Sequence, residues 1–333
     1  MSRIGVISNP TAGSGRGARW GSEALVELSA RGHQIRDLSR GTWAASYEAA
    51  MEHRGDLDAL VVVGGDGMVH LGIQVCARTQ LPLGIVAAGS GNDAATSLGL
   101  PVHDIPGAVG RIDAGLEAPT AIDLGVIEGP PLDHPAAPRY FIAVLSAGID
   151  AAIAAYAANL RYPRGPFKYK VATMRELPRF KPYGVRVRVD DQEWTQLCTL
   201  VAVANAPRFG GGLIVSPESS MTDGKLELVL AEPLSKGAIV KLFPKLYDGT
   251  HVGDPRVRII QATKIEIAPA GINQLLSPGA PGAPGAPADS RGFVGAALPP
   301  AFADGELVGR APMTVTAAPG ALRVLGAQLP VSA

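Results

Sequence analysis

The chain has 333 residues, of which 47% are hydrophobic and 18% charged, and its 30 basic residues balance 30 acidic ones. This length allows two domains with buried cores, and the apolar content excludes a disordered chain. The balanced charge excludes a global field that would attract nucleic acid, so we expect no nucleic-acid partner and only local attraction to any anionic surface.

Strand and helix patterns alternate through the first hundred residues. This alternation predicts a parallel sheet with helices on both faces and ligand binding at the carboxyl ends of its strands. We assign residues 1–120 to this α/β domain. The expected elements, in chain order, are strand Arg3 to Ser8, helix Gly17 to Arg31, strand Gln34 to Leu38, helix Trp43 to His53, strand Ala59 to Val63, helix Met68 to Arg78, strand Leu83 to Ala87 and helix Ala94 to Leu98.

After residue 120 the pattern changes to short β-rich runs separated by turn residues. Residues 121–333 therefore predict a second domain built mainly as an antiparallel β-sandwich. A loop insertion at about 275–300 contains the low-complexity segment Ser277 to Ala288, which cannot bury a core. The expected elements are strands Ile122 to Ile127, Tyr140 to Leu145, Val185 to Val189, Thr199 to Ala204, Lys225 to Leu230, Arg256 to Ile267 and Met313 to Thr316, and helix Ala151 to Leu160.

Several features bear on where the protein works. Cys76 and Cys198 are far apart and lack the Cys/His clustering of a zinc site or a disulfide framework. Residues 1–7 lack the pattern of a secretory signal. The best candidate for a membrane span, Tyr140 to Leu160, contains Asp150, which at mid-helix would cost about 3 kcal/mol on insertion. We expect a cytoplasmic protein, with any membrane contact peripheral at the inner membrane face.

Three glycine-rich loops each follow a predicted strand of the first domain, at residues 9–17, 64–67 and 88–93. Missing side chains allow a phosphate to approach the backbone, and N–H groups at a helix start can hold its charge. None of the loops matches the Walker A pattern or the dinucleotide fingerprint. Each loop alone is commonly just a tight connection, but three at one edge of a sheet predict a nucleotide site.

In order and spacing, these loops resemble the diacylglycerol kinase catalytic family, which also includes sphingosine and ceramide kinases. The family has an Asn-Pro-x-x-Gly loop, a Gly-Gly-Asp-Gly loop and a Gly-Thr-Gly-Asn-Asp loop, in the last of which Ser90 replaces Thr here. The similarity covers nearly the whole chain. Further matching segments are Ile122-Asp123-Leu124-Gly125, Gly210-Gly211-Gly212, Ser216-Pro217, Met221-Thr222-Asp223-Gly224-Lys225-Leu226, Ala303-Asp304-Gly305-Glu306, Ala311-Pro312 and Pro319-Gly320-Ala321-Leu322.

The resemblance implies an ATP-dependent lipid kinase that moves the γ-phosphate of ATP onto a lipid hydroxyl, most directly that of diacylglycerol to give phosphatidic acid. Phosphoryl transfer needs a divalent ion, and the family implies Mg²⁺ held by Asp66, Asp93 and Asp223, partly through water. It also implies a structural magnesium at the Asp223 loop, with the Ser220 and Lys225 carbonyl groups as further ligands. The implied ATP-binding residues are Asn9, Pro10, Thr11, Ala12, Gly13, Thr42, Gly64, Gly65, Asp66, Gly67, Met68, Gly89, Ser90, Gly91, Asn92, Asp93 and Asp123.

The same resemblance implies a general base. Asp304 would take the proton of the lipid hydroxyl, with Glu306 beside it. Asp66 is the competing candidate, because the Gly-Gly-Asp-Gly aspartate has that role in the sphingosine kinase branch. Asp-Gly pairs are also common turns, and we interpret Asp248-Gly249 as a turn only. His70, at a helix start, is interpreted as a capping or packing residue.

Two rival functions stay open on the sequence. NAD kinase resembles this fold and shares Gly-Gly-Asp-Gly, but the Asn-Pro-x-x-Gly loop and the late Asp-Gly-Glu resemble lipid kinases. A lipid- or nucleotide-binding protein without catalysis is the other, because Leu71 removes a carboxylate that relatives have near the nucleotide. The long segment at residues 272–302 before Asp304 favours the same rival. Ser14 also replaces a common Lys, which leaves Arg16 and Arg19 as phosphate partners.

Residues 161–181 are rich in basic and aromatic side chains, with Glu176 as the only acid. Such a segment either solvates a helix face or docks on an anionic membrane, where each basic residue adds up to about 1 kcal/mol. Both interpretations stay open. The sequence identifies neither the acceptor lipid nor the oligomeric state, with a homodimer among the possibilities.

Overall fold

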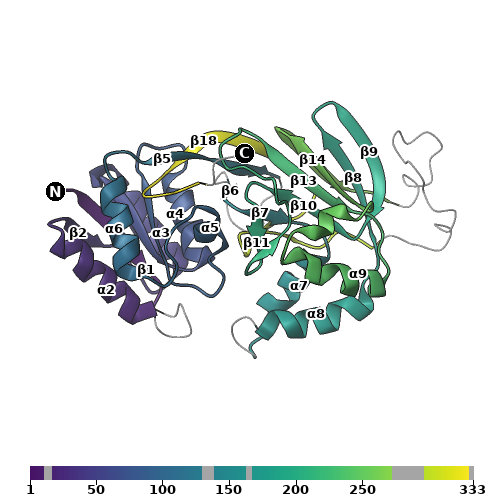
Figure 1. Ribbon diagram of the computed structural model, residues 1–333, viewed down its shortest axis with the longest axis horizontal. Coiled ribbons are helices and arrows are strands. Elements are labelled where there is room, and N and C mark those ends of the chain that lie inside the picture. The colour runs from purple at the N-terminus through teal and green to yellow at the C-terminus, as the bar shows by residue number, and fades with distance from the viewer. Residues whose placement is uncertain (11–16, 130–138, 163–166, 272–295, 330–333) are drawn as a thin grey trace.

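The computed structural model describes residues 1–10, 17–129, 139–162, 167–271 and 296–329. Its N-terminal part is a parallel sheet in the order β2-β1-β3-β4, with helices on both faces (Figure 1). The predicted α/β fold is confirmed. The elements are β1 (Arg3–Ser8), α2 (Gly17–Ala30), β2 (Gln34–Asp37), α3 (Trp43–His53), η1 (Arg54–Asp56), β3 (Ala59–Gly64), α4 (Asp66–Cys76), β4 (Leu83–Ala87), α5 (Asp93–Ser97) and α6 (Ile105–Gly115).

Alternating side chains of β3 explain why both faces of this sheet are covered. Leu60 and Val62 belong to the hydrophobic cluster that includes residues of α3 and α4. Val61 and Val63 belong to the cluster that includes residues of α2 and α6. Because both faces are buried, β3 reads as a continuous apolar run rather than an alternating one. Helix α6 was not predicted, since a proline and glycines interrupt its apolar pattern.

The C-terminal part contains two packed antiparallel arrangements of strands, as predicted. One is a sheet of six strands in the order β14-β13-β10-β7-β16-β17, and the other continues the N-terminal sheet through β18, β15, β8 and β9, with β5 and β6 beside it. Side chains such as Val187, Val203, Leu228 and Ile265 fill the core between them. The strands are β5 (Thr120–Glu128), β6 (Arg139–Phe141), β7 (Val144–Ser146), β8 (Tyr183–Val189), β9 (Gln192–Cys198), β10 (Leu200–Ala204), β11 (Arg208–Phe209), β12 (Leu213–Ile214), β13 (Leu226–Ala231), β14 (Val257–Ala262), β15 (Lys264–Pro269), β16 (Ala301–Ala303), β17 (Glu306–Gly309) and β18 (Met313–Val324).

Strand β18 joins the two halves of the molecule. It pairs antiparallel with β5 along most of its length, and Val324 at its end pairs in parallel with Leu83 at the start of β4 (Figure 1). The C-terminal segment therefore returns to the first half of the chain after completing the second. The predicted domain division near residue 120 stays a prediction, since the sheet itself runs across it.

Two predicted strands are each split between the two sheets. Tyr140 to Leu145 becomes β6 and β7, which leave Ile142 and Ala143 between them. Arg256 to Ile267 becomes β14 and β15 in the same way. The first segment is apolar throughout, and neither segment carries a glycine or proline at the break, so nothing local marks the change of sheet. The first split places two backbone amides at the candidate site.

The remaining helices lie on the outside of the β-rich half. They are α7 (Ile149–Ala158), α8 (Phe167–Arg179), α9 (Lys236–Leu242), η2 (Phe243–Leu246) and η3 (Thr250–Gly253). Within the described residues, none of the helices has the length and apolar character that crossing a membrane requires. Most of the predicted insertion at about 275–300 lies outside the described residues.

Candidate active site

The carboxyl ends of the parallel strands carry the predicted nucleotide loops. At the first loop, the Asn9 amide donates to the Val63 carbonyl at 3.1 Å, and the Pro10 carbonyl accepts from the Ala18 amide at 3.2 Å. The first bond holds the start of the loop beside β3, and the second joins the residues at its two ends. The predicted ATP contacts Thr11, Ala12 and Gly13, together with Ser14 and Arg16, lie outside the described residues.

The second and third loops are in direct backbone contact. A Cβ atom on Gly89 would lie 2.3 Å from Cα of Gly65, so only glycine fits there. Asn92 adopts a left-handed conformation with φ of +59°, and its side chain closes the third loop by bonding the Gly89 amide at 2.8 Å and the Gly89 carbonyl at 2.9 Å. The structure therefore brings these two predicted ATP loops together, with Met68 packed beneath Gly64.

Asp66 and Asp93 meet where those loops touch. The Asn92 amide donates to Oδ2 of Asp66 at 3.0 Å. A Cβ atom on Gly91 would lie 2.7 Å from Oδ2 of Asp66 and 3.6 Å from Oδ2 of Asp93. Burial, and then the charge of Asp93, raises the pKa of Asp66 to about 6. Oδ1 of Asp66 is buried and accepts no hydrogen bond from the described residues, a cost that a bound cation would offset.

Asp93 is held by the β-rich half. Its two carboxylate oxygens accept the amides of Gly211 and Gly212, each at 2.7 Å. Burial raises the pKa of Asp93, while these amides and the positive charge of Arg208 oppose the shift. The loop Gly210-Gly211-Gly212, for which the sequence indicated only a family resemblance, is therefore part of the site.

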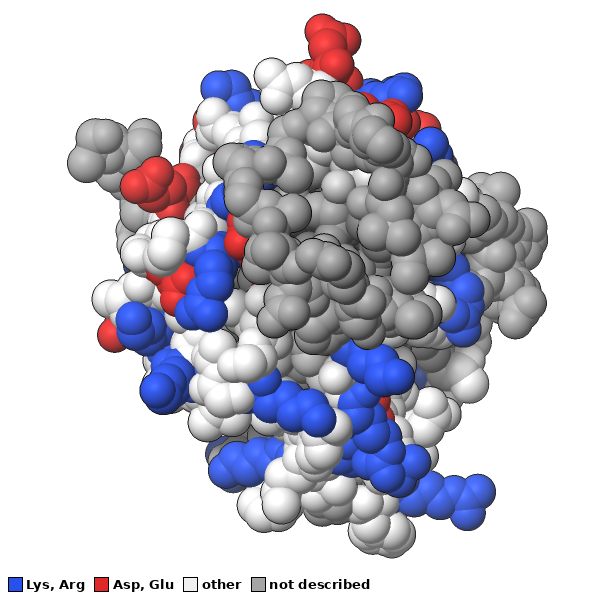
Figure 2. Space-filling model, turned by 90° about the vertical axis from the view of Figure 1, so that its right-hand side faces the viewer, with Lys and Arg blue, Asp and Glu red and all other residues white. Residues whose placement is uncertain are grey.

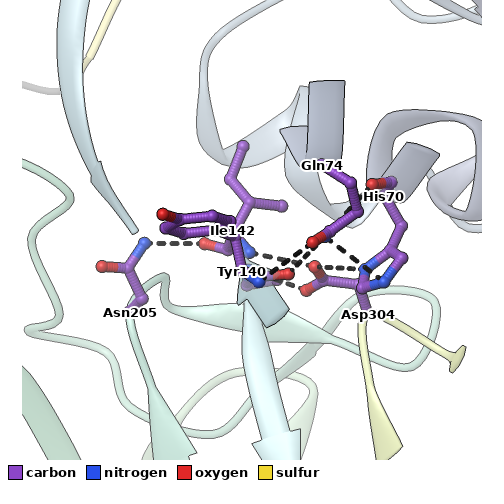
Figure 3. Close-up of polar contacts among 7 residues, drawn as sticks. His70, Gln74, Tyr140, Ile142, Asn205 and Asp304 are labelled. Carbon is purple, nitrogen blue, oxygen red and sulfur yellow. Dashed lines mark hydrogen bonds and ion pairs between the residues drawn. The ribbon is translucent and has the colours of Figure 1, made fainter. Parts of the chain in front are cut away.

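Asp304 lies in the tight turn between β16 and β17, and after burial its charge helps to raise the pKa of both Asp66 and Asp93. Asp304 and Gly305 both have positive φ, of +52° and +86°, as two-residue hairpin turns require. The Asp304 side chain is only 2% exposed. Its Oδ2 accepts the Ile142 amide at 2.9 Å and its Oδ1 accepts the Ala143 amide at 2.8 Å (Figure 3). The split between β6 and β7 thus supplies both donors.

His70 and Gln74 of α4 connect the nucleotide loops to Asp304. His70 Nδ1 lies 3.4 Å from Oδ2 of Asp304 (Figure 3). Gln74 donates to the Tyr140 carbonyl at 2.7 Å, accepts the Tyr140 amide at 3.1 Å, and reaches His70 Nε2 at 3.5 Å. This contact was not predicted from the sequence, although His70 is one helical turn beyond Asp66 on the same face of α4.

Glu306 and Tyr169 complete the described surroundings. A Cβ atom on Gly67 would lie 2.8 Å from Oε1 of Glu306, so this exposed carboxylate is next to the start of α4. Burial, and then the charges of Glu306 and Asp66, raises the pKa of Tyr169 on α8. Tyr169 is therefore near the same site, on the side of the β-rich half, whereas its sequence context indicated only a basic segment.

Comparison with known proteins decides the family. The diacylglycerol kinase catalytic domain matches residues 3–127, and the YegS C-terminal NAD kinase beta sandwich-like domain matches residues 143–326. A diacylglycerol kinase of Mycobacterium tuberculosis (strain ATCC 25618 / H37Rv) is 30% identical over 328 residues, which cover 98% of this chain and 95% of that relative.

This chain belongs to the diacylglycerol kinase catalytic domain family. A diacylglycerol kinase of Bacillus subtilis (strain 168) is 23% identical over 271 residues, covering 80% of this chain and 86% of the relative. A solved structure described as a putative diacylglycerol kinase from Bacillus anthracis superposes with a TM-score of 0.70 at 19% identity, covering 97% of this chain and 96% of that one. The latter likeness establishes the shared two-part fold.

In this member of the diacylglycerol kinase family, the Asp123 side chain joins two loops of the β-rich half, at Gly224 and Gly320. It is buried, its Oδ1 accepts the Gly320 amide and its Oδ2 the Gly224 amide, both at 2.7 Å. Asn205 donates to the Asp123 carbonyl at 3.1 Å. It also donates to the Ile142 carbonyl at 2.8 Å (Figure 3). Asn205 thereby links Asp123 to the peptide group between Ile142 and Ala143, and the N–H of this peptide group donates to Asp304. The ATP contact assigned to Asp123 stays a prediction.

Asp223 lies at a separate turn. Its carboxylate accepts the Lys225 amide at 3.0 Å and the Gln261 side chain at 2.9 Å, and nearby Ser220 Oγ accepts the Thr222 amide at 3.3 Å. Across the described part of the chain, no group of three or more His, Cys, Asp or Glu side chains is arranged to hold a metal. The structure brings Asp66 and Asp93 together but shows no contact between them and Asp223. Thr42, another predicted ATP residue, is exposed and caps α3 through the Ala45 amide.

Proposed function

We propose that this chain is an ATP-dependent lipid kinase that transfers the γ-phosphate of ATP to the hydroxyl of a lipid, with diacylglycerol as the first candidate and phosphatidic acid as its product. The observation that carries the proposal is the buried, amide-held carboxylate of Asp304 beside the Asp66–Asp93 pair at the nucleotide loops. The relatives named diacylglycerol kinase support the choice of acceptor.

Asp304 is our candidate for the general base. A carboxylate has about four lone-pair positions, and the amides of Ile142 and Ala143 with His70 use three of them. The fourth is free to accept the proton of the attacking lipid hydroxyl, while the other three hold the carboxylate in place. His70 is thereby a positioning residue. Asp66 remains the competing base.

Mg²⁺ is the expected cofactor, and Asp66 with Asp93 would hold it. The buried, unpartnered Oδ1 of Asp66 fits a hard cation, which prefers oxygen ligands. When bound, the ion would neutralise charge on the transferred phosphate. The predicted structural magnesium at Asp223, Ser220 and Lys225 stays a separate proposal. ATP would lie over the three glycine loops, near Asn9, Gly67 and Gly91.

Arg208 is the cation that we assign to the phosphates of ATP. The described carboxylates of the site are Asp66, Asp93, Asp304 and Glu306, so a polyphosphate needs positive charge there besides the metal. Arg208 precedes the glycine loop that binds Asp93, and its charge acts on Asp93. Its half-buried guanidinium makes no hydrogen bond or ion pair with another described residue. Arg19, by contrast, is exposed and lies 4.0 Å from Glu23.

Replacing Arg208 with Ala is expected to lower kcat/KM for ATP by about 10²-fold, because one preorganised donor to the reacting phosphate is lost. Arg208→Lys should recover part of the loss. Arg323→Ala is the matched control, because Arg323 lies next to Val324, which pairs with Leu83 at the opposite end of β4 from the nucleotide loops. Steady-state kinetics with varied ATP measures the effect. A normal kcat/KM in Arg208→Ala would remove Arg208 from the site.

Transfer of labelled γ-phosphate from ATP to lipids in mixed micelles with Mg²⁺ tests the proposed function. A labelled lipid would support it and would identify the acceptor among diacylglycerol, sphingosine and ceramide. Label on added NAD and on no lipid would favour an NAD kinase. Tight lipid binding without transfer would favour a binding protein. Leu71 was one reason to consider a binding protein, because relatives have a carboxylate at this position. Here the Leu71 side chain is fully buried and packs in the hydrophobic core under α4, so it weakens the case for a binding protein.

The lipid acceptor implies peripheral contact with the inner face of a membrane. Helix α8 buries only Ala172, exposes Phe167 and Met174, and carries four basic residues of segment 161–181, which are Lys168, Lys170, Arg175 and Arg179. We keep this segment as the proposed site of contact, in a protein that otherwise works in the cytoplasm.

A further inference from the structure

Residues Lys236–Tyr247 comprise α9, η2 and the residue that follows η2, and this surface segment buries none of its side chains fully. We call it the lysine ridge. Val240, Phe243 and Tyr247 are 57%, 41% and 59% exposed. Large apolar side chains exposed together mark an interaction site more often than single ones do. The ridge lies outside the basic segment 161–181 and outside the candidate active site.

The charge of the lysine ridge has one sign. Lys236, Lys241 and Lys245 are its only charged residues, and the first acid after them is Asp248. After the hydrogen bonds that these carboxylates accept, the charge of Lys245 also lowers the pKa of Asp248 and Asp254, which lie beyond the ridge. Lys241 and Lys245 are exposed, and their ammonium groups form neither a hydrogen bond nor an ion pair with other described residues. Two of the three lysines are therefore free to meet an external anion.

The lysine ridge continues the basic surface of α8. The Lys236 ammonium donates to the Pro178 carbonyl in the last turn of α8. Ile239 packs against the same core cluster as Leu177 and Phe180. Figure 2 shows the side of the molecule that lies to the right in Figure 1. Lys and Arg side chains gather over the lower part of this face, where α8 and α9 lie, with few acidic side chains among them.

We propose that the lysine ridge binds the surface of a bilayer containing anionic lipids, with Phe243 and Tyr247 placed among the headgroups. A bilayer suits the ridge better than a protein partner does, because lysine is depleted at protein interfaces, whereas lysine with interfacial aromatic residues is typical of membrane surfaces. This inference rests on the proposed function for its purpose, which is to bring the kinase to its lipid. The ridge adjoins α8 through the bond from Lys236 to Pro178, and α8 also carries Tyr169. Tyr169 is near enough to the site that burial, and then the charges of Glu306 and Asp66, raises its pKa. Docking there would bring the active site to its lipid.

Sedimentation with vesicles tests the lysine ridge. Wild type should bind vesicles of phosphatidylglycerol and phosphatidylcholine and bind pure phosphatidylcholine far less. Lys241→Glu with Lys245→Glu should weaken binding to the anionic vesicles by about 10-fold or more, because each basic residue contributes about 1 kcal/mol. Phe243→Ser with Tyr247→Ser should weaken binding while keeping its dependence on salt. Arg186→Glu with Arg323→Glu is the control, since it makes the same charge change at exposed strand positions outside the ridge.

Normal binding by both ridge variants, or no difference from the control, would overturn the proposal. So would a wild-type dimer that the ridge variants convert to monomer, because the occupant would then be a second copy. Phosphorylation of a water-soluble short-chain diacylglycerol should be the same in wild type and ridge variants. Vesicle binding without any kinase activity would leave the ridge in place and remove the proposed function instead.

Discussion

Replacing Asp304 with Asn is expected to lower kcat for lipid phosphorylation by about 10²- to 10⁴-fold, the range for losing a general base. The amide has no basic lone pair for the proton of the lipid hydroxyl. Steady-state kinetics with saturating ATP, Mg²⁺ and lipid measures the loss. Asp248→Asn is the matched control, because Asp248 is followed by glycine too but its carboxylate bonds only Thr250.

Stability must be measured on the same Asp304→Asn protein. Asn has one oxygen, so one of the amides of Ile142 and Ala143 would face an NH₂ group instead of an acceptor. An unsatisfied buried donor costs about 1–3 kcal/mol, and thermal unfolding should reveal that cost. A folded Asp304→Asn protein that keeps near-normal kcat would show that Asp304 is structural. The base would then be sought at Asp66.

Replacing Asp66 with Asn is expected to stabilise the metal-free protein while abolishing most of its activity. Burial raises the pKa of Asp66 from 3.8 to about 6, so above pH 6 the folded state holds a charge that it disfavours. Between pH 4 and 6 the folded state binds more protons than the unfolded state, and stability falls as the pH rises. A shift of about 2 pH units corresponds to about 3 kcal/mol, which is the upper limit for the gain in the Asn variant at pH 8.

Denaturant unfolding of both proteins without metal, at several pH values, measures this gain. The advantage of Asp66→Asn should be largest above pH 7 and should shrink as the pH falls through 6 toward 4. Adding Mg²⁺ should stabilise wild type only, and the loss of charge stabilisation should lower phosphoryl transfer by at least about 10²-fold. An Asn variant that is less stable than wild type at pH 8 without metal would contradict the burial argument.

The sequence by itself determined most elements of the α/β half, with α6 the exception, and the order of the nucleotide loops. Local patterns fixed strands such as β1 and β3, because their apolar runs are bounded by turn residues, and α3 was predicted to the residue. The structure explains why the loops need glycine, since Gly65 and Gly89 approach so closely that no side chain fits. Asp66 and Asp93 could be recognised as neighbours because strands β3 and β4 end at the same edge of the sheet.

Only the tertiary structure decided how Asp304 is held and what surrounds it. Its partners come from α4 and from the break between β6 and β7, and no short-range pattern marks that break, because the segment is apolar throughout. The amides of Gly211 and Gly212 reach Asp93 from 118 and 119 residues away. Such contacts depend on how two sheets and their helices pack, whereas the periodicity of a sequence reports only which face of each element is buried.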